Sequence, residues 1–278
     1  MRVEAFYLSM DGERRGRRFC LFHPPQSGAA RAAFVYVHPF AEEMNKSRRM
    51  AALQARALSA AGCAVLQIDL LGCGDSDGDF ADATWSDWIE DVVEAARWLR
   101  ERADAPLWLW GLRAGCLLAS EAATRIDAPS HCLFWQAPSQ GSTLLQQFLR
   151  LKAAGDMLEG KSKGAVERSR AELDQGASVD VGGYRLAPAL AAGLDAARLV
   201  PPPAPGRLEW LELSSRAEPV LSAASQRTTE QWRDSGWEVR SRVLPGLAFW
   251  QTSEIEEVPG LVHASTHAWA ELAQTFAT

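Results

Sequence analysis

The sequence predicts an α/β fold, with a mostly parallel sheet of eight strands, helices on both faces and a helical cap inserted after the sixth strand. Short apolar runs rich in β-branched residues alternate with segments in which apolar residues recur at helical spacing. The alternation stops at residue 139 and resumes at residue 207. With 278 residues, 47% hydrophobic and 23% charged, the chain is long and apolar enough to bury a sizeable core.

Eight short apolar runs are predicted to be strands. The first two flank the turn-rich stretch Met10-Asp-Gly-Glu13, which predicts an antiparallel hairpin at one edge of the sheet. The later runs are separated by segments long enough to hold a helix, which is typical of parallel strands. The runs lie at residues 5–8, 17–23, 32–37, 64–69, 107–110, 132–135, 208–213 and 237–244.

Helical spacing of apolar residues predicts the covering helices. Thr84, followed three residues later by Asp87, is typical of a capping box, and Trp88, Val92 and Leu99 then recur on one face. The predicted helices lie at residues 47–61, 84–99, 223–233 and 261–276, and a further helix follows the fifth strand and ends near residue 124.

The interruption of the alternation predicts how the chain is divided. Between residues 139 and 206 the chain is helical, polar and irregular, with Gly182-Gly183 inside it and Pro201-Pro-Pro203 near its end. We therefore expect a core built from residues 1–138 and 207–278, with residues 139–206 inserted as a helical cap.

Charge and composition exclude several function classes. Twenty-nine Lys and Arg against 35 Asp and Glu give a net charge of -6, the wrong sign for a nonspecific nucleic-acid binder. No stretch approaches the roughly 20 apolar residues of a membrane span, and the first twenty residues show no secretory signal. The five cysteines are scattered and never form a CxxC pair, so we expect reduced thiols, a cytoplasmic protein and neither metal nor cofactor.

The loop after the fifth predicted strand carries the most informative motif. Gly111-Leu-Arg-Ala-Gly115 has the spacing of the nucleophile elbow G-x-S-x-G, with Arg113 in place of the serine. A guanidinium cannot attack a carbonyl, but at a helix N-terminus it is suited to bind a carboxylate or phosphate. The alternative is that Arg113 only pairs with an acid and holds loops together. The candidate acids are Glu42, Glu43, Asp75 and Asp77.

Several segments resemble known families. Asp69-Leu-Leu-Gly-Cys-Gly-Asp-Ser76, the elbow-like turn and the insertion resemble the α/β-hydrolase superfamily. More closely, Tyr36-Val-His-Pro-Phe-Ala-Glu-Glu-Met-Asn-Lys-Ser-Arg-Arg49 and Phe249-Trp-Gln-Thr-Ser-Glu-Ile255 resemble the family called exosortase A system-associated hydrolase 2. The resemblance implies an α/β-hydrolase fold in a protein connected with bacterial exopolysaccharide production and the sorting of surface proteins.

The triad positions that the resemblance implies are degenerate. After the strand ending at residue 213, only Glu218 could serve as the acid, and the loop at 245–254, where a histidine should follow, contains none. The next histidines, His263 and His267, form a His-x-x-x-His pair on the last predicted helix. This pair lacks the intervening Glu and a third ligand, so we predict no metal site.

Other residues are candidates for chemistry or for ligand contact. Cys73 could act as a nucleophile with His38 as its base, although the favoured interpretation is that Cys73 fills a turn, and His38 could equally brace its loop. Trp135 and Trp250 lie at strand ends, where an aromatic plane could hold a sugar or an acyl chain. The predicted ligand-contacting residues are Arg113, His38, Phe40, Gly72, Leu112, Trp135 and Trp250.

Three functions therefore remain open. The preferred hypothesis is a protein with a degenerate Ser-His-acid site that binds an anionic small molecule, of acyl or sugar type. The second is an active esterase, thioesterase or acyl-transfer enzyme that uses a non-serine nucleophile, with Cys73 and His38 as candidates. The third is a scaffold for an exopolysaccharide enzyme, contacted through the cap.

Overall fold

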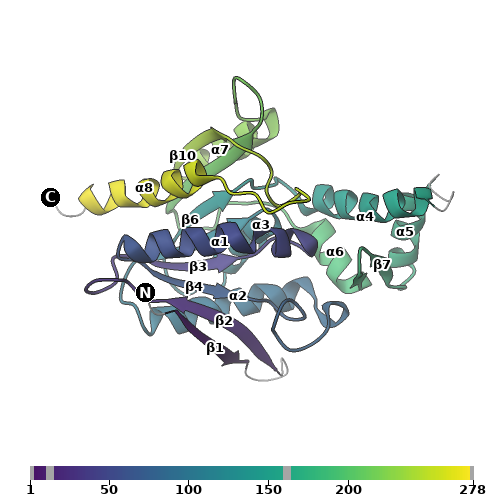
Figure 1. Cartoon of the computed structure of the whole chain (residues 1–278), viewed down its shortest axis with the longest axis horizontal. Helices are drawn as coiled ribbons and strands as arrows, with labels where there is room; N and C mark the ends of the chain where they lie inside the picture. The colour runs from purple at the N-terminus through teal and green to yellow at the C-terminus, as the bar shows by residue number, and fades with distance from the viewer. Residues whose placement is uncertain (1–2, 11–15, 159–163, 276–278) are drawn as a thin grey trace.

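The computed structural model describes residues 3–10, 16–158 and 164–275 and has a sheet of eight strands (Figure 1). The strand order is β1-β2-β4-β3-β5-β6-β9-β10. β1 pairs antiparallel with β2 and β2 with β4, whereas the remaining neighbours are parallel. All eight predicted strands are confirmed. Their bounds are β1 Glu4–Ser9, β2 Arg17–His23, β3 Ala33–Val37, β4 Ala64–Ile68, β5 Leu107–Leu112, β6 Ser130–Trp135, β9 Arg207–Ser214 and β10 Glu238–Pro245.

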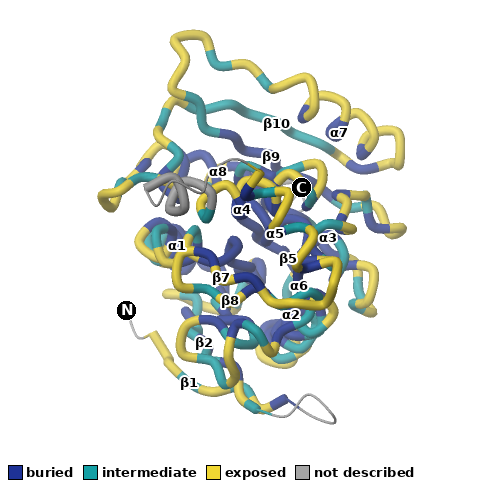
Figure 2. The backbone as a smooth tube through the Cα atoms, turned by 90° about the vertical axis from the view of Figure 1, so that its right-hand side faces the viewer, coloured by how far each residue is buried: buried dark blue, intermediate teal, exposed yellow. Residues whose placement is uncertain are grey.

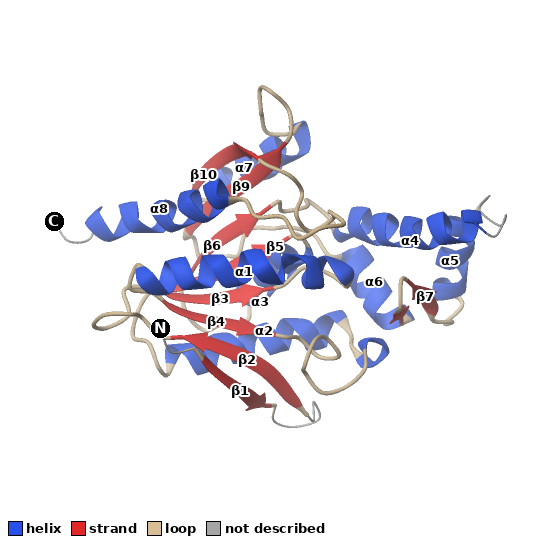
Figure 3. Ribbon diagram, in the orientation of Figure 1, coloured by secondary structure: helices blue, strands red, loops and turns tan. Residues whose placement is uncertain are grey.

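Helices cover both faces of the sheet, as predicted. Figure 3 shows α1 (Glu42–Ala60) and α8 (Pro259–Thr275) along the near face, where they pack on one apolar cluster. The opposite face packs on a second cluster with α2 (Trp85–Arg100), α3 (Ala114–Ala123) and α7 (Ala223–Asp234). Every residue of β3 and β5 is buried between these layers, and Figure 2 shows the burial concentrated in the central strands. No helix in the described ranges has the length and apolar character needed to cross a bilayer.

The local sequence predicts the start of α2 correctly but gives no signal for the start of α1. Thr84 caps α2 as predicted: its hydroxyl oxygen accepts from the Asp87 amide at 3.1 Å, while Asp87 accepts from the Thr84 amide at 3.0 Å. The predicted start of α1 at residue 47 is wrong, because the helix begins at Glu42. It follows Ala41, which has a positive φ of 51° and no capping side chain, so the usual sequence signal of an N-terminus is missing.

The segment between β6 and β9 contains the inserted elements, grouped at one end of the sheet (Figure 1). Three of them are helices, α4 (Gly141–Leu158), α5 (Ala165–Asp174) and α6 (Pro188–Ala196). The structure adds a hairpin of β7 (Val179–Val181) and β8 (Tyr184–Leu186) that the sequence analysis did not predict. We call the segment from α4 to α6 the cap elements. The boundaries of the cap at residues 139 and 206 stay a prediction.

A fully buried ion pair supports the loop after β4. Arg18 Nε on β2 lies 2.8 Å from Asp91 Oδ2 on α2, and neither side chain is exposed. The same carboxylate oxygen accepts from the Leu71 amide at 2.8 Å and so anchors the loop. Burial raises the pKa of Asp91 to about 6, because the loss of hydration outweighs the attraction of Arg18. The pair therefore supports the loop after β4, and removing either side chain would leave the other as an unpaired buried charge.

Candidate functional site

The turn between β5 and α3 keeps the shape of a nucleophile elbow. Arg113 is its apex, with φ 54° and ψ -118°, a region that non-glycine residues rarely adopt. A Cβ added to Gly111 would lie 2.6 Å from the backbone of Cys116, and one added to Gly115 would lie 2.1 Å from the Val37 carbonyl oxygen. Both flanking glycines are therefore required for the close approach of helix and strand, as predicted.

The Arg113 side chain joins the core to the cap elements. Its Nε and Nη2 donate to the Glu43 carboxylate of α1, with the shortest contact at 3.2 Å, and Nη2 also donates to Gln147 Oε1 of α4 at 2.7 Å. The guanidinium carbon lies 5.7 Å from the centre of the Trp250 ring. Of the four candidate acids, Glu43 is the one that pairs with Arg113, whereas Glu42 accepts from other side chains.

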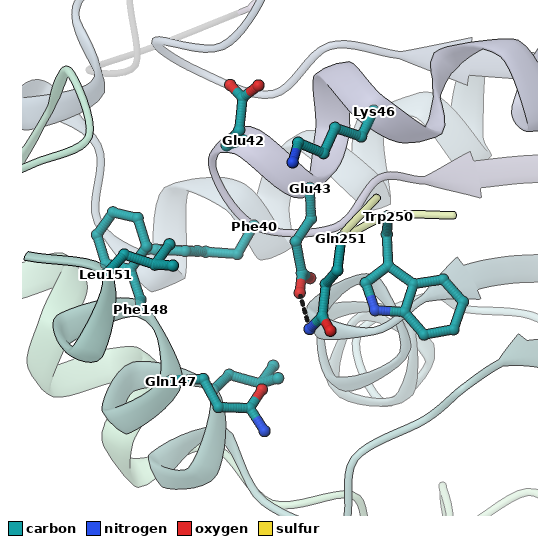
Figure 4. Close-up of a pocket in the computed structure, with 10 residues that line it drawn as sticks. Phe40, Glu42, Glu43, Lys46, Gln147, Phe148, Leu151, Trp250 and Gln251 are labelled. Carbon is teal, nitrogen blue, oxygen red and sulfur yellow. Dashed lines mark hydrogen bonds between the residues drawn. The ribbon is translucent and has the colours of Figure 1, made fainter. Parts of the chain in front are cut away.

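A cavity of about 310 Å³ lies beside this ion pair (Figure 4). Its walls come from α4, from the first turns of α1 and the loop before it, and from the loop after β10, and most of their surface is apolar. Lys46 and two glutamates supply its charges. The lining residues are Phe40, Glu42, Glu43, Lys46, Leu144, Gln147, Phe148, Leu151, Trp250 and Gln251. A partly apolar cavity with a few convergent polar groups is the usual form of a small-molecule site.

Two cationic groups near the cavity keep hydrogen-bonding capacity. Lys46 lines the cavity, whereas Arg113 is not a lining residue and instead contacts three residues that are, Glu43, Gln147 and Trp250. Within the described ranges, Arg113 Nη1 has no hydrogen-bond partner, although the side chain is only 11% exposed. Lys46 makes no ion pair with any residue that the structure describes. Because both groups are permanent donors near neutrality, they can receive the oxygens of an anionic ligand.

The β7–β8 hairpin contacts the start of α1 through Tyr184, and none of its residues lines the cavity. The Tyr184 hydroxyl donates to Glu42 Oε2 at 3.2 Å and accepts from Asn45 at 2.9 Å, while its ring packs edge-on against Phe80. Burial and the Glu42 carboxylate raise the pKa of Tyr184 to about 12, so the hydroxyl stays protonated and keeps donating. Tyr184 and Gln147 thus connect the cap elements to the start of α1 and to the elbow.

Comparison with known proteins identifies the family. Residues 28–202 match the family model described as serine aminopeptidase, S33, which is more than half of the chain. The chain belongs to the serine aminopeptidase S33 family. Among curated proteins, none matches it by sequence.

Solved structures with the same fold are hydrolases of distant sequence. Est1E from Butyrivibrio proteoclasticus with bound ferulic acid is similar at a TM-score of 0.69 and 17% identity, over 96% of this chain and 98% of that chain. A highly thermostable carboxyl esterase from Bacillus coagulans in complex with glycerol is similar at a TM-score of 0.63 and 14% identity, over 100% of this chain and 98% of that chain. At these identities the likeness shows the α/β-hydrolase fold, which confirms the predicted fold class.

This S33-family chain lacks a histidine at the cavity. All five histidines lie in the described ranges, and none lines it. The loop after β10 instead buries Phe249 and Trp250, and Glu218 in the loop after β9 is exposed. His263 and His267 lie on the exposed side of α8 with ring centres 4.1 Å apart, and no group of three metal-ligating side chains occurs among the described residues.

His38 braces its loop through both ring nitrogens. Its Nε2 accepts from the Leu70 amide at 3.2 Å, so Nδ1 carries the proton and donates to the Pro39 carbonyl at 2.8 Å. Burial lowers the pKa of His38, which keeps the ring neutral near neutral pH. A ring held in this way has no free lone pair to accept a proton from Cys73.

Cys73 is buried in the turn after β4. Loss of hydration, together with the carboxylates of Asp69 and Asp91, raises the pKa of its thiol well above the usual value. Arg48 is the cation that lowers the pKa of this thiol, and its effect is smaller than that of burial and the two carboxylates. Because the thiolate is the reactive form, this position disfavours Cys73 as a nucleophile in this S33-family protein.

The remaining predicted contact residues divide into two groups. Phe40 and Trp250 line the cavity. Leu112 and Trp135 do not, because both are buried in the core, where the Trp135 indole donates to Ser265 Oγ at 2.8 Å. Gly72 is a turn residue with φ 70°, and a Cβ there would lie 2.2 Å from the Asp79 carbonyl oxygen.

Sequence reasoning missed the α4 wall of the cavity. Gln147 and Phe148 lie three and four residues after Leu144, and Leu151 lies four and three residues after them, so the four share one face of the helix. That spacing was visible in the sequence. It marks an apolar face but does not show which part of the core the face covers.

Proposed function

We propose that this S33-family protein binds a small molecule with an anionic group and an apolar body, and that it does not hydrolyse esters. The observation that supports the proposal is the position of Arg113. It occupies the apex at which the elbow motif places an attacking hydroxyl, beside the cavity and with Nη1 available. An arginine at this point supplies fixed positive charge in place of a nucleophile.

The surroundings of Arg113 also disfavour acyl chemistry. A hydroxyl nucleophile needs a base within about 3 Å and a group that orients the base. Trp250, which contacts the guanidinium, and Gln251 stand in the loop where the histidine would follow the last strand. Neither an indole nor an amide accepts a proton near neutral pH.

The charges and walls of the cavity suggest how the ligand is oriented. Phe40, Leu144 and Phe148 offer an apolar wall, which fits an alkyl or aromatic body. Glu43 neutralises one face of the Arg113 guanidinium, and Nη1 and Lys46 remain for the anionic group. A medium-length carboxylate is the simplest compound with this order of groups.

Calorimetry with octanoate and its neutral analogue octanamide tests the binding proposal. The wild type is expected to bind octanoate about tenfold more tightly, the value of one charge-assisted contact, and Arg113→Gln should lose this preference. Arg185→Gln is a matched control, because Arg185 pairs with Asp180 on the cap hairpin, outside the cavity lining. Equal affinity for octanoate in the wild type and Arg113→Gln would reject the role of Arg113.

A panel of p-nitrophenyl esters and acyl thioesters tests the absence of hydrolysis. We expect no turnover above that of a Cys73→Ala/Arg113→Ala variant purified in the same way, because the cavity has neither a hydroxyl at its apex nor a histidine. Turnover by the wild type that disappears in Cys73→Ala would establish the esterase alternative instead.

We also propose a cytoplasmic setting in bacterial exopolysaccharide production. The resemblance of residues 36–49 and 249–255 to exosortase A system-associated hydrolase 2 supports the biological context. The five free cysteines fit a reducing compartment. Unchanged exopolysaccharide yield after deletion of the gene would contradict this context.

A further inference from the structure

A second cavity adjoins the first and has the opposite chemistry. It has a volume of about 450 Å³ and is formed by the loops after β9 and β10. Gln251 lines both cavities, so the two are neighbours that share one wall. We call this second space the polar cavity. Its lining residues are Leu213, Ser214, Ser215, Arg216, Gly246, Leu247, Ala248, Gln251 and Thr252.

Five residues with polar donor groups line the polar cavity beside four that have none, and no acidic side chain is among its described lining residues. Arg216 is exposed and makes no ion pair with any residue in the described part of the chain. Ser214 Oγ accepts from the Arg216 amide at 3.1 Å, which leaves its hydroxyl hydrogen available for a ligand. An unpaired guanidinium among hydroxyls fits an anionic group.

Gln251 lines both cavities and forms a partition between them. In Figure 4 its amide points toward the Glu43 carboxylate, to which it donates at 3.4 Å. This is a long hydrogen bond from an exposed side chain, and only a small free energy opposes its rotation. When the side chain turns, a ligand beside Trp250 can extend from the apolar cavity into the polar cavity.

We infer that the ligand carries a second anionic arm, which the polar cavity receives at Arg216. This inference rests on the proposed function and deepens it. The alkyl body lies in the apolar cavity, the first anionic group contacts Arg113, and the second passes Gln251. The chemical class is therefore an alkyl chain ending in two neighbouring acidic groups. A monoacid can satisfy only one of the two cationic positions.

Hexylsuccinate is the matched probe, because it is octanoate with a carboxymethyl group on its α-carbon. At about pH 8, where both carboxylates are ionised, calorimetry of the wild type should give about tenfold tighter binding of hexylsuccinate than of octanoate. Arg216→Gln should remove this difference and leave the affinity for octanoate unchanged. Gln251→Ala should keep or increase the difference, because it removes the partition. Arg185→Gln serves again as the control that leaves both affinities unchanged.

The outcomes separate this inference from the proposed function. If octanoate binds with dependence on Arg113 but hexylsuccinate binds no more tightly, the second arm is rejected and the proposed function stands. If the preference for hexylsuccinate persists in Arg216→Gln, the assignment to the polar cavity is wrong. Binding of hexylsuccinate that depends on Arg216 without any binding of octanoate would retain the polar cavity and reject the anionic contact at Arg113. Binding of neither compound rejects both.

Discussion

Arg18→Met is expected to lower the free energy of unfolding by about 3–5 kcal/mol, because it leaves Asp91 as an uncompensated charge in the interior. Both side chains of the pair are fully buried, so water cannot replace the lost partner. Urea unfolding measures the change. Arg17→Met is a matched control from the adjacent position, where the Arg17–Asp77 pair is exposed to solvent, and it should change stability little.

A double variant distinguishes the lost charge balance from lost packing. In Arg18→Met/Asp91→Asn the buried charge is gone and the amide oxygen can still accept from the Leu71 amide, so most of the stability should return. A double variant as unstable as Arg18→Met would show that packing of the arginine, rather than its charge, supports the fold.

The pH dependence of Arg18→Met supplies a second test. Burial places the folded-state pKa of Asp91 at about 6, above its ordinary value of 3.8, so the folded state binds the proton more readily. The stability that Asp91 contributes is therefore complete below its ordinary pKa and is lost as pH rises toward and through its folded-state pKa. Without Arg18 this pKa rises further, so the deficit of the variant should shrink as pH falls from about 7 to 5.

Gly115→Ala is expected to destabilise the protein by about 3 kcal/mol, at the upper end of the range for overpacking. The added methyl group would lie 2.1 Å from the Val37 carbonyl oxygen and 2.9 Å from that of His38. Both obstacles are backbone atoms, so β3 and α3 must separate to accept it. Thermal or urea unfolding gives the size of the effect.

Gly260→Ala is the matched control for this substitution. It lies in the first turn of α8, where a Cβ would meet nothing within 4 Å, and alanine there should be neutral or stabilising by up to about 1 kcal/mol. If Gly115→Ala were as stable as Gly260→Ala, the close contact of α3 with β3 would not be needed to form the elbow.

The architecture was predictable because its signals are local. Strands such as Ala33–Val37 are continuous apolar runs in the sequence. Thr84 and Asp87 together specify a helix start within four residues. The elbow was predictable for the same reason, since the glycines at 111 and 115 bracket one turn. The start of α1 was not, because Ala41 carries no signal of its own and its conformation is imposed by the surrounding fold.

The site was predictable only in part, because its contacts join distant segments. Four acids are candidate partners of Arg113 in the sequence. Only the folded structure shows that the partner is Glu43, which is 70 residues away. The largest part of the cavity that the sequence analysis did not predict is the wall formed by the cap elements. The face of α4 that includes Leu144 and Phe148 was visible as a pattern, but its target was not. Strands of three residues, as in the β7–β8 hairpin, are too short to show an alternating pattern.

The backbone at Arg113 bears on how this protein could have changed during evolution. Such a conformation costs roughly 1–3 kcal/mol and persists because its neighbours impose it, here the two glycines and the bond from the Arg113 amide to the Trp135 carbonyl. None of these supports depends on which side chain the apex residue carries. The backbone of the turn therefore holds the apex residue in place whatever its side chain is, so a single substitution can change the chemical group presented there without rebuilding the turn.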